Sequence, residues 1–266
     1  MVSIIEKSYT VESETLDSIF AHWRQTDSFL TWNCLFVLPV WLKPWWDNFG
    51  GNAALYLLSI RHEGRIIGIA PLQRSDATAR LIGDENVCDN LDFIVAPETS
   101  AEFYRTLLDH LKQDGIKRLE LEPVRQDSSV MVQLLPMAEK TGCRISSEGH
   151  DMSYELALPD SWDDYLTLLS AKERHEIRRK LRRLYEAGPI SYRLVEDVSS
   201  AKKEMETFLE LFRSNRADKA EFMNDQMVSF FKGLAEALEE ARILKLFILN
   251  LDDSTVSATM CFDYRS

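Results

Sequence analysis

The chain has few of the residues that build metal sites or disulfide frameworks. It contains only four cysteines in 266 residues, and no two of them are spaced as C-x-x-C. Its five histidines stand apart from one another and from the cysteines, so no zinc-ligand spacing is present. We therefore expect no metal site, structural histidines, and reduced thiols that are mostly buried. These residues are Cys34, Cys88, Cys143 and Cys261, and His22, His62, His110, His150 and His175.

Common catalytic and phosphate-binding motifs, a signal peptide and a membrane span are also missing from the sequence. The sequence has neither a G-x-S-x-G nucleophile elbow nor a Walker phosphate loop. Its N-terminus lacks the basic and then apolar pattern of a signal peptide. The most apolar stretch, residues 29–42, is interrupted by Thr31, Asn33 and Pro39 and is shorter than the roughly 20 residues of a membrane span. These absences predict a cytoplasmic protein without a transmembrane segment.

Glycine and proline are scarce as well, and the 31 basic residues are outnumbered by 43 acidic ones. The ten glycines and eight prolines, beside a hydrophobic content of 45%, are typical of a globular protein that buries a sizeable core. A length of 266 residues favours two domains. The formal net charge of -12 disfavours sequence-independent DNA binding by the body of the protein.

Positive charge is nevertheless concentrated in one segment, SAKERHEIRRKLRRLYEAGP, at residues 170–189. Its stretch from Lys172 to Arg183 holds seven basic residues and only two acidic ones. Ser170 followed by Glu173 is a capping box, and Gly188-Pro189 is a helix stop. The segment therefore predicts a capped helix in a chain that is otherwise strongly acidic.

The predicted helix has two different faces. Ile177, Leu181 and Leu184 fall within about 60° of one another at 100° per residue, which predicts one buried stripe. The opposite side is basic with little local acidic compensation, although Glu176 is spaced to pair with Lys180. The candidates for anion or phosphate binding on this basic side are Lys172, Arg178, Arg179, Arg182 and Arg183.

Four explanations of the basic side stay open: a solvated helix surface, a phosphate-bearing ligand, a membrane surface or a nucleic acid. A basic-zipper helix would continue into heptads, which Gly188-Pro189 prevents. A helix-turn-helix needs a second helix, whereas residues 190–197 predict a strand. We therefore expect no sequence-specific DNA binding, and anion binding is the sharper of the remaining interpretations.

The chain also contains an internal repeat. Residues 54–73 and 242–262 each predict two strands joined by a tight turn, and a shift of 189 positions aligns them without a gap. The same shift aligns two helical patterns, which lie at residues 12–23 and 38–49 in the first copy and at 200–212 and 226–238 in the second. Each copy is therefore predicted to be a strand, helix, helix, strand, strand unit.

The repeat predicts a domain organisation. Residues 1–150 form the first domain, residues 151–189 a bridge that contains a strand at 152–158 and the basic helix, and residues 190–266 the second domain. The first copy continues past its strand pair with further strands and a helix, whereas the second copy reaches only Ser266. We expect the second domain to lack its C-terminal part.

The residues around the basic helix resemble a known family. In residues 160–197 a short helix is followed by Leu-Ser and by an arginine- and lysine-rich helix that ends in glycine. This arrangement resembles the signature of the FemAB-like, cellulose-biosynthesis CelD-type family of GNAT acetyltransferases, as do residues 41–72 and 89–95. The resemblance covers nearly the whole chain from about Trp23 onward. It implies an α/β (α+β) fold of tandem GNAT-like domains, each with a mixed central sheet flanked by helices.

The resemblance also implies a chemistry. An acyl group would pass from acetyl-CoA or another acyl-CoA to an amine or hydroxyl of a small-molecule or glycan acceptor, often in envelope or exopolysaccharide assembly. Such an enzyme positions the thioester and the nucleophile, and backbone donors stabilise the tetrahedral oxyanion. Two alternatives stay open. One is a non-catalytic phosphate- or polysaccharide-binding module, and the other is an aminoacyl-tRNA-dependent FemAB-like transferase.

The first copy departs from the family where the pyrophosphate of the cofactor binds. GNAT proteins hold it on backbone N–H groups of an Arg/Gln-x-x-Gly-x-Gly/Ala loop at a helix N-terminus. Here the loop is VAPETSA, residues 95–101, which has no glycine, contains Pro97 without an N–H, and places Glu98 at the pyrophosphate position. We expect that the first copy does not bind CoA in the usual way, and in the second copy this loop would lie beyond Ser266.

No catalytic residue can be assigned, so whether the chain is an enzyme stays open. The family's histidine position in residues 209–217 corresponds to Phe212, and the family's tryptophan is absent from this stretch. Asp89 and Asp92 predict loop and turn chemistry rather than a general-base pair.

Three tryptophans, Trp41, Trp45 and Trp46, lie in one predicted helix of the first copy. They predict core positions. Alternatively, Trp45 and Trp46 line a substrate cleft, where an aromatic ring stacks on a sugar.

Overall fold

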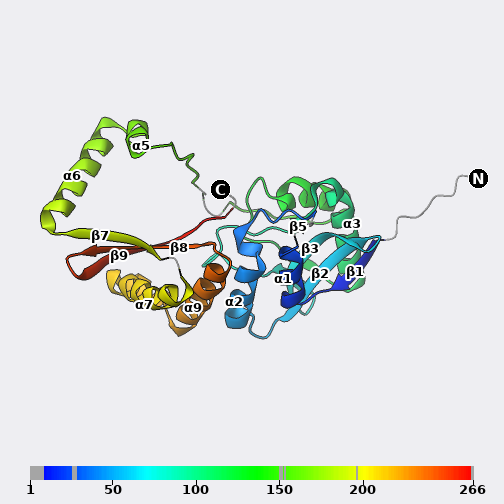
Figure 1. Cartoon of the computed structure of the whole chain (residues 1–266). Helices are drawn as coiled ribbons and strands as arrows, with labels where there is room; N and C mark the ends of the chain where they lie inside the picture. The colour runs from blue at the N-terminus through cyan, green and yellow to red at the C-terminus, as the bar shows by residue number, and fades with distance from the viewer. Residues whose placement is uncertain (1–8, 26–28, 150–151, 153, 196, 265–266) are drawn as a thin grey trace, which may run out of the picture. The chain divides into compact units, whose positions relative to one another are not determined.

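The computed structural model describes residues 9–25, 29–149, 152, 154–195 and 197–264, and His150 lies outside them. Contacts divide the chain into two compact units (Figure 1). Unit 1 contains residues 1–147, 225–242 and 264–266, and unit 2 contains residues 148–224 and 243–263. The contacts therefore group one helix of the second repeat copy with the first copy. The sequence-based domain boundaries at residues 150 and 189 stay a prediction.

Unit 1 is built on a mixed sheet. Its strands are ordered β1-β2-β3-β4-β6, and β5 pairs with β3. The pairing of β4 with β6 is parallel, and the other pairings are antiparallel. The strands are β1 (Tyr9–Ser13), β2 (Ala54–His62), β3 (Arg65–Ser75), β4 (Thr78–Leu81), β5 (Ile94–Val95) and β6 (Arg118–Glu120).

Helices flank this sheet, as the fold class predicts. Their apolar positions recur at helical spacing, and α3 packs so closely on β3 that a Cβ at Gly68 would lie 2.3 Å from the ring of Phe103. Helix α9 packs on α2, where the ring centroids of Trp41 and Phe230 are 6.2 Å apart. The helices of unit 1 are α1 (Leu16–Trp23), η1 (Leu35–Val37), α2 (Pro39–Phe49), η2 (Pro97–Thr99), α3 (Ser100–Gln113), η3 (Val130–Leu134), α4 (Leu135–Lys140) and α9 (Asp225–Glu240).

Unit 2 is built on a smaller sheet of three antiparallel strands, ordered β7-β8-β9. Helix α7 packs on it, and the buried positions of β8 alternate, so that Leu246 and Ile248 are covered while Phe247 is 43% exposed. The strands are β7 (Ile190–Val195), β8 (Leu244–Leu251) and β9 (Ser254–Phe262). The helices are α5 (Trp162–Leu168), α6 (Ala171–Ala187), α7 (Val198–Asn215) and α8 (Ala217–Phe222).

The structure confirms the internal repeat in the two hairpins. The β2–β3 register is shifted between Ile60 and Arg61, and the β8–β9 register between Leu249 and Asn250, which are 189 positions later. The turn residue Glu63 has φ 50°, and its equivalent Asp252 has φ 53°. Bulge and turn therefore recur with the predicted shift, although the residues that form them differ.

Two sequence-based expectations are wrong. The described residues of the stretch 152–158 form no strand, because none of the described strands pairs with it. Its apolar side chains at alternate positions, such as Tyr154 and Leu158, are exposed. The thiols are not mostly buried either, since Cys143 and Cys261 are exposed and Cys34 is partly covered, which leaves Cys88 as the buried one.

The described residues contain neither a membrane-spanning helix nor a metal-ligand cluster. No helix there is both long and apolar enough to cross a bilayer. Within the same residues no three His, Cys, Asp or Glu side chains are grouped as metal ligands would be.

Candidate anion-binding site on helix α6

The candidate site lies on α6, which begins where the sequence predicts. The Ser170 hydroxyl accepts a hydrogen bond from the Glu173 N–H at 3.3 Å, and the Glu173 carboxylate accepts one from the Ser170 N–H at 2.8 Å. These hydrogen bonds hold the pKa of Glu173 below its usual value. The capping box therefore fixes the start of the basic helix.

A second interaction, which the sequence analysis missed, fixes the corner between α5 and α6. The Arg174 guanidinium donates to the carbonyl oxygen of Leu169 at 2.7 Å and to that of Leu166 at 3.3 Å. These carbonyls belong to the end of α5. The last carbonyls of a helix have no N–H donors within the helix and need other partners. Arg174 thus binds backbone carbonyls and not a ligand. It fixes the connection between α5 and the basic helix.

The far end of α6 is fixed to the hairpin of unit 2. After Gly188, the carbonyl of Pro189 accepts a hydrogen bond from the Asp252 N–H at 2.8 Å. A Cβ at Gly188 would lie 2.9 Å from the Asp252 carboxylate, so glycine is needed at this position for close approach. Both ends of the basic helix are therefore positioned by specific contacts within unit 2.

The basic side of α6 has more acidic compensation than the sequence predicts. Arg179 forms two hydrogen bonds with the Glu176 carboxylate, at 2.6 and 2.9 Å. This pairing lowers the pKa of Glu176 and raises that of Arg179. Lys180 lies 3.9 Å from Glu176, as the spacing predicts, and Arg182 lies 3.7 Å from Glu186 one turn later. The expectation of little compensation is wrong because Glu176 and Glu186 are both within reach of an arginine.

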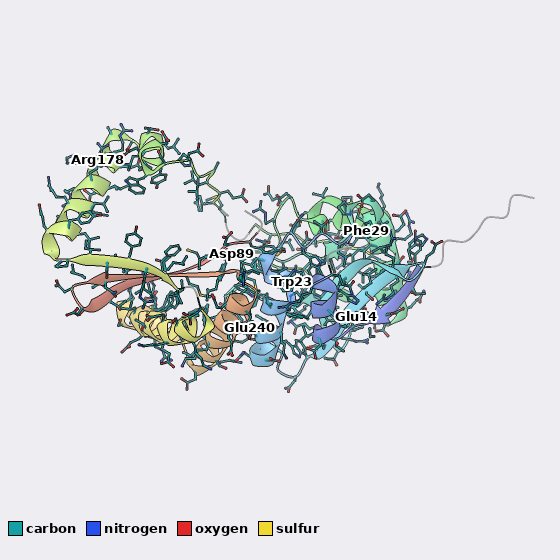
Figure 2. All side chains as sticks on the ribbon, in the orientation of Figure 1. Glu14, Trp23, Phe29, Asp89, Arg178 and Glu240 are labelled. Carbon is teal, nitrogen blue, oxygen red and sulfur yellow. The ribbon has the colours of Figure 1, made fainter. Side chains whose placement is uncertain are left out.

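Three of the predicted cations keep their charge uncompensated. Lys172, Arg178 and Arg183 form no ion pair with another residue in the part of the chain that the structure describes, and all three are exposed. Figure 2 shows Arg178 on α6. Exposed ion pairs contribute little stability, so Arg179 and Arg182 can also exchange their carboxylates for a ligand anion. The face can therefore accept an anion with several oxygens through forked arginine contacts.

The predicted buried stripe of α6 is only partly covered. Ile177, Leu181 and Leu184 are half-buried, and no residue of α6 is buried. The prediction of a buried stripe is wrong in this respect, since α6 contains no buried residue.

The tryptophans lie in unit 1 on α2, away from the basic helix in sequence. Trp41 is buried, as predicted, and so is Trp45, which is 4% exposed. The indole N–H of Trp45 donates to the Asp84 carboxylate at 2.7 Å. Trp46 is half-buried and covers Gly50, where a Cβ would lie 2.8 Å from its ring. Trp45 therefore serves the core, and Trp46 is the more accessible of the two predicted cleft aromatics.

The loop before α3 differs from a phosphate cradle, as its sequence suggests. Pro97–Thr99 form the short helix η2, and the Thr99 N–H donates to the Ala96 carbonyl at 3.1 Å. The Ser100 hydroxyl donates to the Pro97 carbonyl at 3.0 Å. These local hydrogen bonds use groups that a pyrophosphate would need. The expectation that the first copy does not bind CoA in the usual way stays a prediction.

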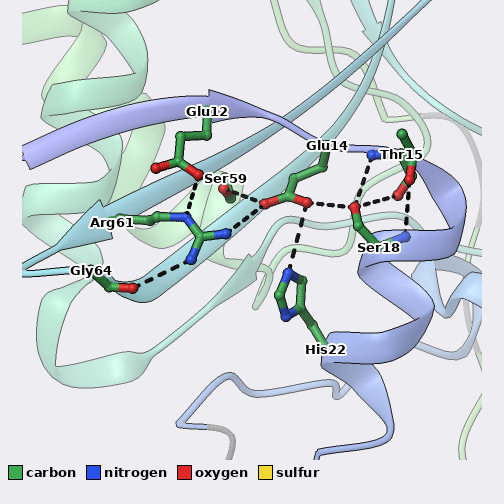
Figure 3. A network of polar contacts seen from close by, with 8 residues as sticks. All are labelled: Glu12, Glu14, Thr15, Ser18, His22, Ser59, Arg61 and Gly64. Atoms are coloured by element: carbon green, nitrogen blue, oxygen red, sulfur yellow. Dashed lines mark hydrogen bonds and ion pairs between the residues drawn. The ribbon is translucent and has the colours of Figure 1, made fainter.

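A buried carboxylate in unit 1 was also missed by the sequence analysis (Figure 3). Glu14, whose side chain is 6% exposed, accepts hydrogen bonds from Ser18, from Ser59 at 2.7 Å and from Arg61 at 3.0 Å. His22 lies 3.7 Å from it. Burial raises the pKa of Glu14, but these hydrogen bonds and the nearby His22 outweigh burial and lower it. Because its oxygens already have partners, Glu14 serves the structure of β1, β2 and α1.

Asp92 lies in a loop and has a structural role, but its partner is distant in the chain and not within a local turn. Its carboxylate accepts hydrogen bonds from the Ser129 N–H at 2.8 Å and from the Ser129 hydroxyl at 2.7 Å. Ser129 precedes η3, so Asp92 holds the start of this helix. The buried Tyr104 hydroxyl bonds to Ser129 from α3.

Comparisons with known proteins bear on the family and the fold of the chain. Residues 171–266, which begin at the first residue of α6, match the family model described as "Acetyltransferase (GNAT) domain". The crystal structure of FemX is similar with a TM-score of 0.55 and 17% sequence identity, which shows a shared fold. The match covers 91% of this chain and 58% of the FemX chain, so this chain spans less than two thirds of the FemX length. No curated protein matches the chain. The GNAT domain match concerns residues 171–266 and the FemX match concerns the fold, whereas the FemAB-like and CelD-type assignments stay predictions.

Proposed function

We propose that this chain is part of an acyltransferase of the GNAT type, in which α6 holds an anionic part of the acyl donor or of the acceptor. The single observation that carries the proposal is the capped basic helix at the start of the region that matches the GNAT domain model. Acyl transfer from acetyl-CoA or another acyl-CoA to an amine or hydroxyl is the reaction that this match supports. A role in envelope or polysaccharide assembly and a cytoplasmic location are further parts of the proposal.

Lys172, Arg178 and Arg183 are the residues of this chain that fit the phosphate groups of such a donor. Their side chains are exposed, and the two arginines present forked N–H donors that match phosphate oxygens. The loop at residues 95–101 in unit 1 does not fit, because its groups bond to one another. The bound donor would supply the activated thioester, and the role of α6 is to bind and orient the anion.

The test is thermal unfolding of the full chain with and without acetyl-CoA, because a ligand that binds only the folded state raises the unfolding midpoint. The wild-type chain is expected to show this rise, and R178E/R183E is expected to lose it. K202E/K203E changes the charge equally at exposed positions of α7 and is expected to keep the rise. No rise in the wild type, or an equal rise in R178E/R183E, would contradict the proposal.

Pyrophosphate as a second probe separates catalysis from simple binding. A non-catalytic module would respond to pyrophosphate and to acetyl-CoA alike and would release no free CoA thiol in the presence of amine acceptors. Release of the thiol that depends on Arg178 and Arg183 would support acyl transfer.

An aminoacyl-tRNA-dependent FemAB-like transferase is the second candidate function. The uncompensated cations of α6 also suit a phosphate backbone, and such binding weakens steeply as salt increases. R182E/R183E is expected to abolish retention of tRNA at low salt if this candidate is correct. Unchanged retention would exclude it.

A further inference from the structure

Unit 1 contains a groove of about 510 Å³ between α1, α2 and α9, far in sequence from the basic helix. The volume is in the range of small-molecule sites. Side chains of Phe20, Val40, Pro44 and Ala237 give it an apolar lining. The groove therefore has room and an apolar surface for the stem of a small ligand.

Two residues that disfavour helices lie in this lining, at equivalent positions of the internal repeat. Pro44 is inside α2, where it has no N–H to give to the carbonyl of Val40. Gly233 is inside α9, where glycine costs about 1 kcal/mol relative to alanine. Packing does not demand this glycine, since the nearest atom to a Cβ there would be the Pro44 Cβ at 4.0 Å. The missing side chain of Gly233 leaves the groove open.

The charges at the rim are not balanced. Asp47 is paired with Lys43 at 3.3 Å, and the Arg24 guanidinium lies over the ring of Phe20. Glu236 and Glu240, one turn apart on α9, line the groove and form no ion pair with another described residue. Figure 2 shows Glu240 on α9. Two carboxylates at one side of an apolar groove are complementary to a group with several N–H donors and a positive charge.

We propose that this groove binds a primary alkylammonium group, such as that of a lysine side chain, with the ammonium at Glu236 and Glu240 and the methylene stem on the apolar lining. Lysine stems commonly cover apolar surface while the charged head stays at the rim. Because both carboxylates are exposed, the binding is weak, with a dissociation constant on the order of millimolar. This inference does not depend on the proposed acyl transfer.

The test is ligand-observed NMR on the full chain with pentylammonium, beside 1-pentanol with the same stem and ammonium chloride with the same charge. Pentylammonium is expected to bind at least about fivefold more tightly than either control. E236Q/E240Q is expected to weaken it about fivefold, whereas E98Q/D109N removes the same charge outside the groove and is expected to change nothing.

Gly233→Leu provides the second variant, because it fills the groove without removing charge. It is expected to abolish pentylammonium binding while the unfolding midpoint stays equal or rises, since leucine favours a helix. Equal weakening in E98Q/D109N would show attraction to net charge only and would overturn the proposal. So would undiminished binding in a folded Gly233→Leu chain, or tighter binding of 1-pentanol than of pentylammonium.

Discussion

At the scale of single residues, a few polar side chains decide how the chain is held. Arg174 gives its donors to the end of α5, Asp92 holds the start of η3, and Glu14 joins α1 to β2. A structural role of Asp92 could be predicted from its loop position, but its partner Ser129 could not, because Ser129 is 37 residues away in the chain. The partners of Glu14 include Ser59 and Arg61, which are far away in the chain, so no local pattern indicates them.

The lowered pKa of Glu14 predicts a pH dependence of stability. A carboxylate whose pKa is lower in the folded state stabilises it above the pKa of the unfolded chain, about 4.3, and this contribution is lost as the pH falls through the folded pKa. Glu14→Gln is expected to cost about 2 kcal/mol at pH 7 and progressively less below pH 4. Denaturant unfolding of both chains at several pH values measures the difference.

Glu98→Gln is the matched control, because Glu98 is exposed on η2. It is expected to change the free energy of unfolding by no more than about 0.5 kcal/mol at any of these pH values. A difference between Glu14→Gln and the wild type that stays constant down to pH 3 would contradict the charged role of Glu14.

At the scale of elements, local sequence signals predict helix starts and turns well, whereas strand pairing and helix packing are predicted poorly. Helix α6 begins at its predicted cap, and both hairpins have the predicted shift of 189 positions, because capping and turns depend on neighbouring residues. The described residues of the stretch 152–158 do not form the predicted strand, because alternation alone does not supply a partner strand. The basic side of α6 was predicted residue by residue, but its ion pairs were underestimated. The packing of α9 on α2 was not predicted at all.

The cap of α6 gives a prediction for this helix. Ser170→Ala removes the acceptor of the Glu173 N–H and is expected to destabilise the first turn by about 1 kcal/mol. Hydrogen exchange of the first-turn amides should therefore become about fivefold faster. Ser170→Asp retains an acceptor and should keep the wild-type rates. Unchanged exchange in Ser170→Ala would show that tertiary contacts, rather than the cap, hold this end.

At the scale of the whole molecule, equivalent positions of the two repeat copies differ in how far they are covered. Leu58 of β2 is 2% exposed, and its equivalent Phe247 of β8 is 43% exposed. Ile67 of β3 is 4% exposed, and its equivalent Val256 of β9 is 44% exposed. In unit 1, α3 covers the sheet at Gly68 through Phe103. The same hairpin geometry is therefore stabilised by less apolar burial in unit 2.

This difference predicts unequal stability within the two units. Each exposed apolar side chain contributes less than a buried one, so the amides of β8 and β9 should exchange at least about tenfold faster than those of β2 and β3. Native-state hydrogen exchange measures both hairpins in one sample. Phe247→Ser should leave the exchange rates of the β8 and β9 amides nearly unchanged. Leu58→Ser should unfold unit 1. Equal exchange in both hairpins would contradict the argument.

The unequal exposure of the four thiols has a practical consequence. Cys143 of unit 1 and Cys261 of unit 2 are exposed, whereas burial raises the pKa of Cys34 to about 11 and that of Cys88 to about 12. Thiolates are the reactive form, so a maleimide dye at neutral pH reacts with the first two cysteines and spares the others. The natural sequence thus carries one labelling position in each unit. Energy transfer between two dyes can follow their separation as ligands are added, without any substitution.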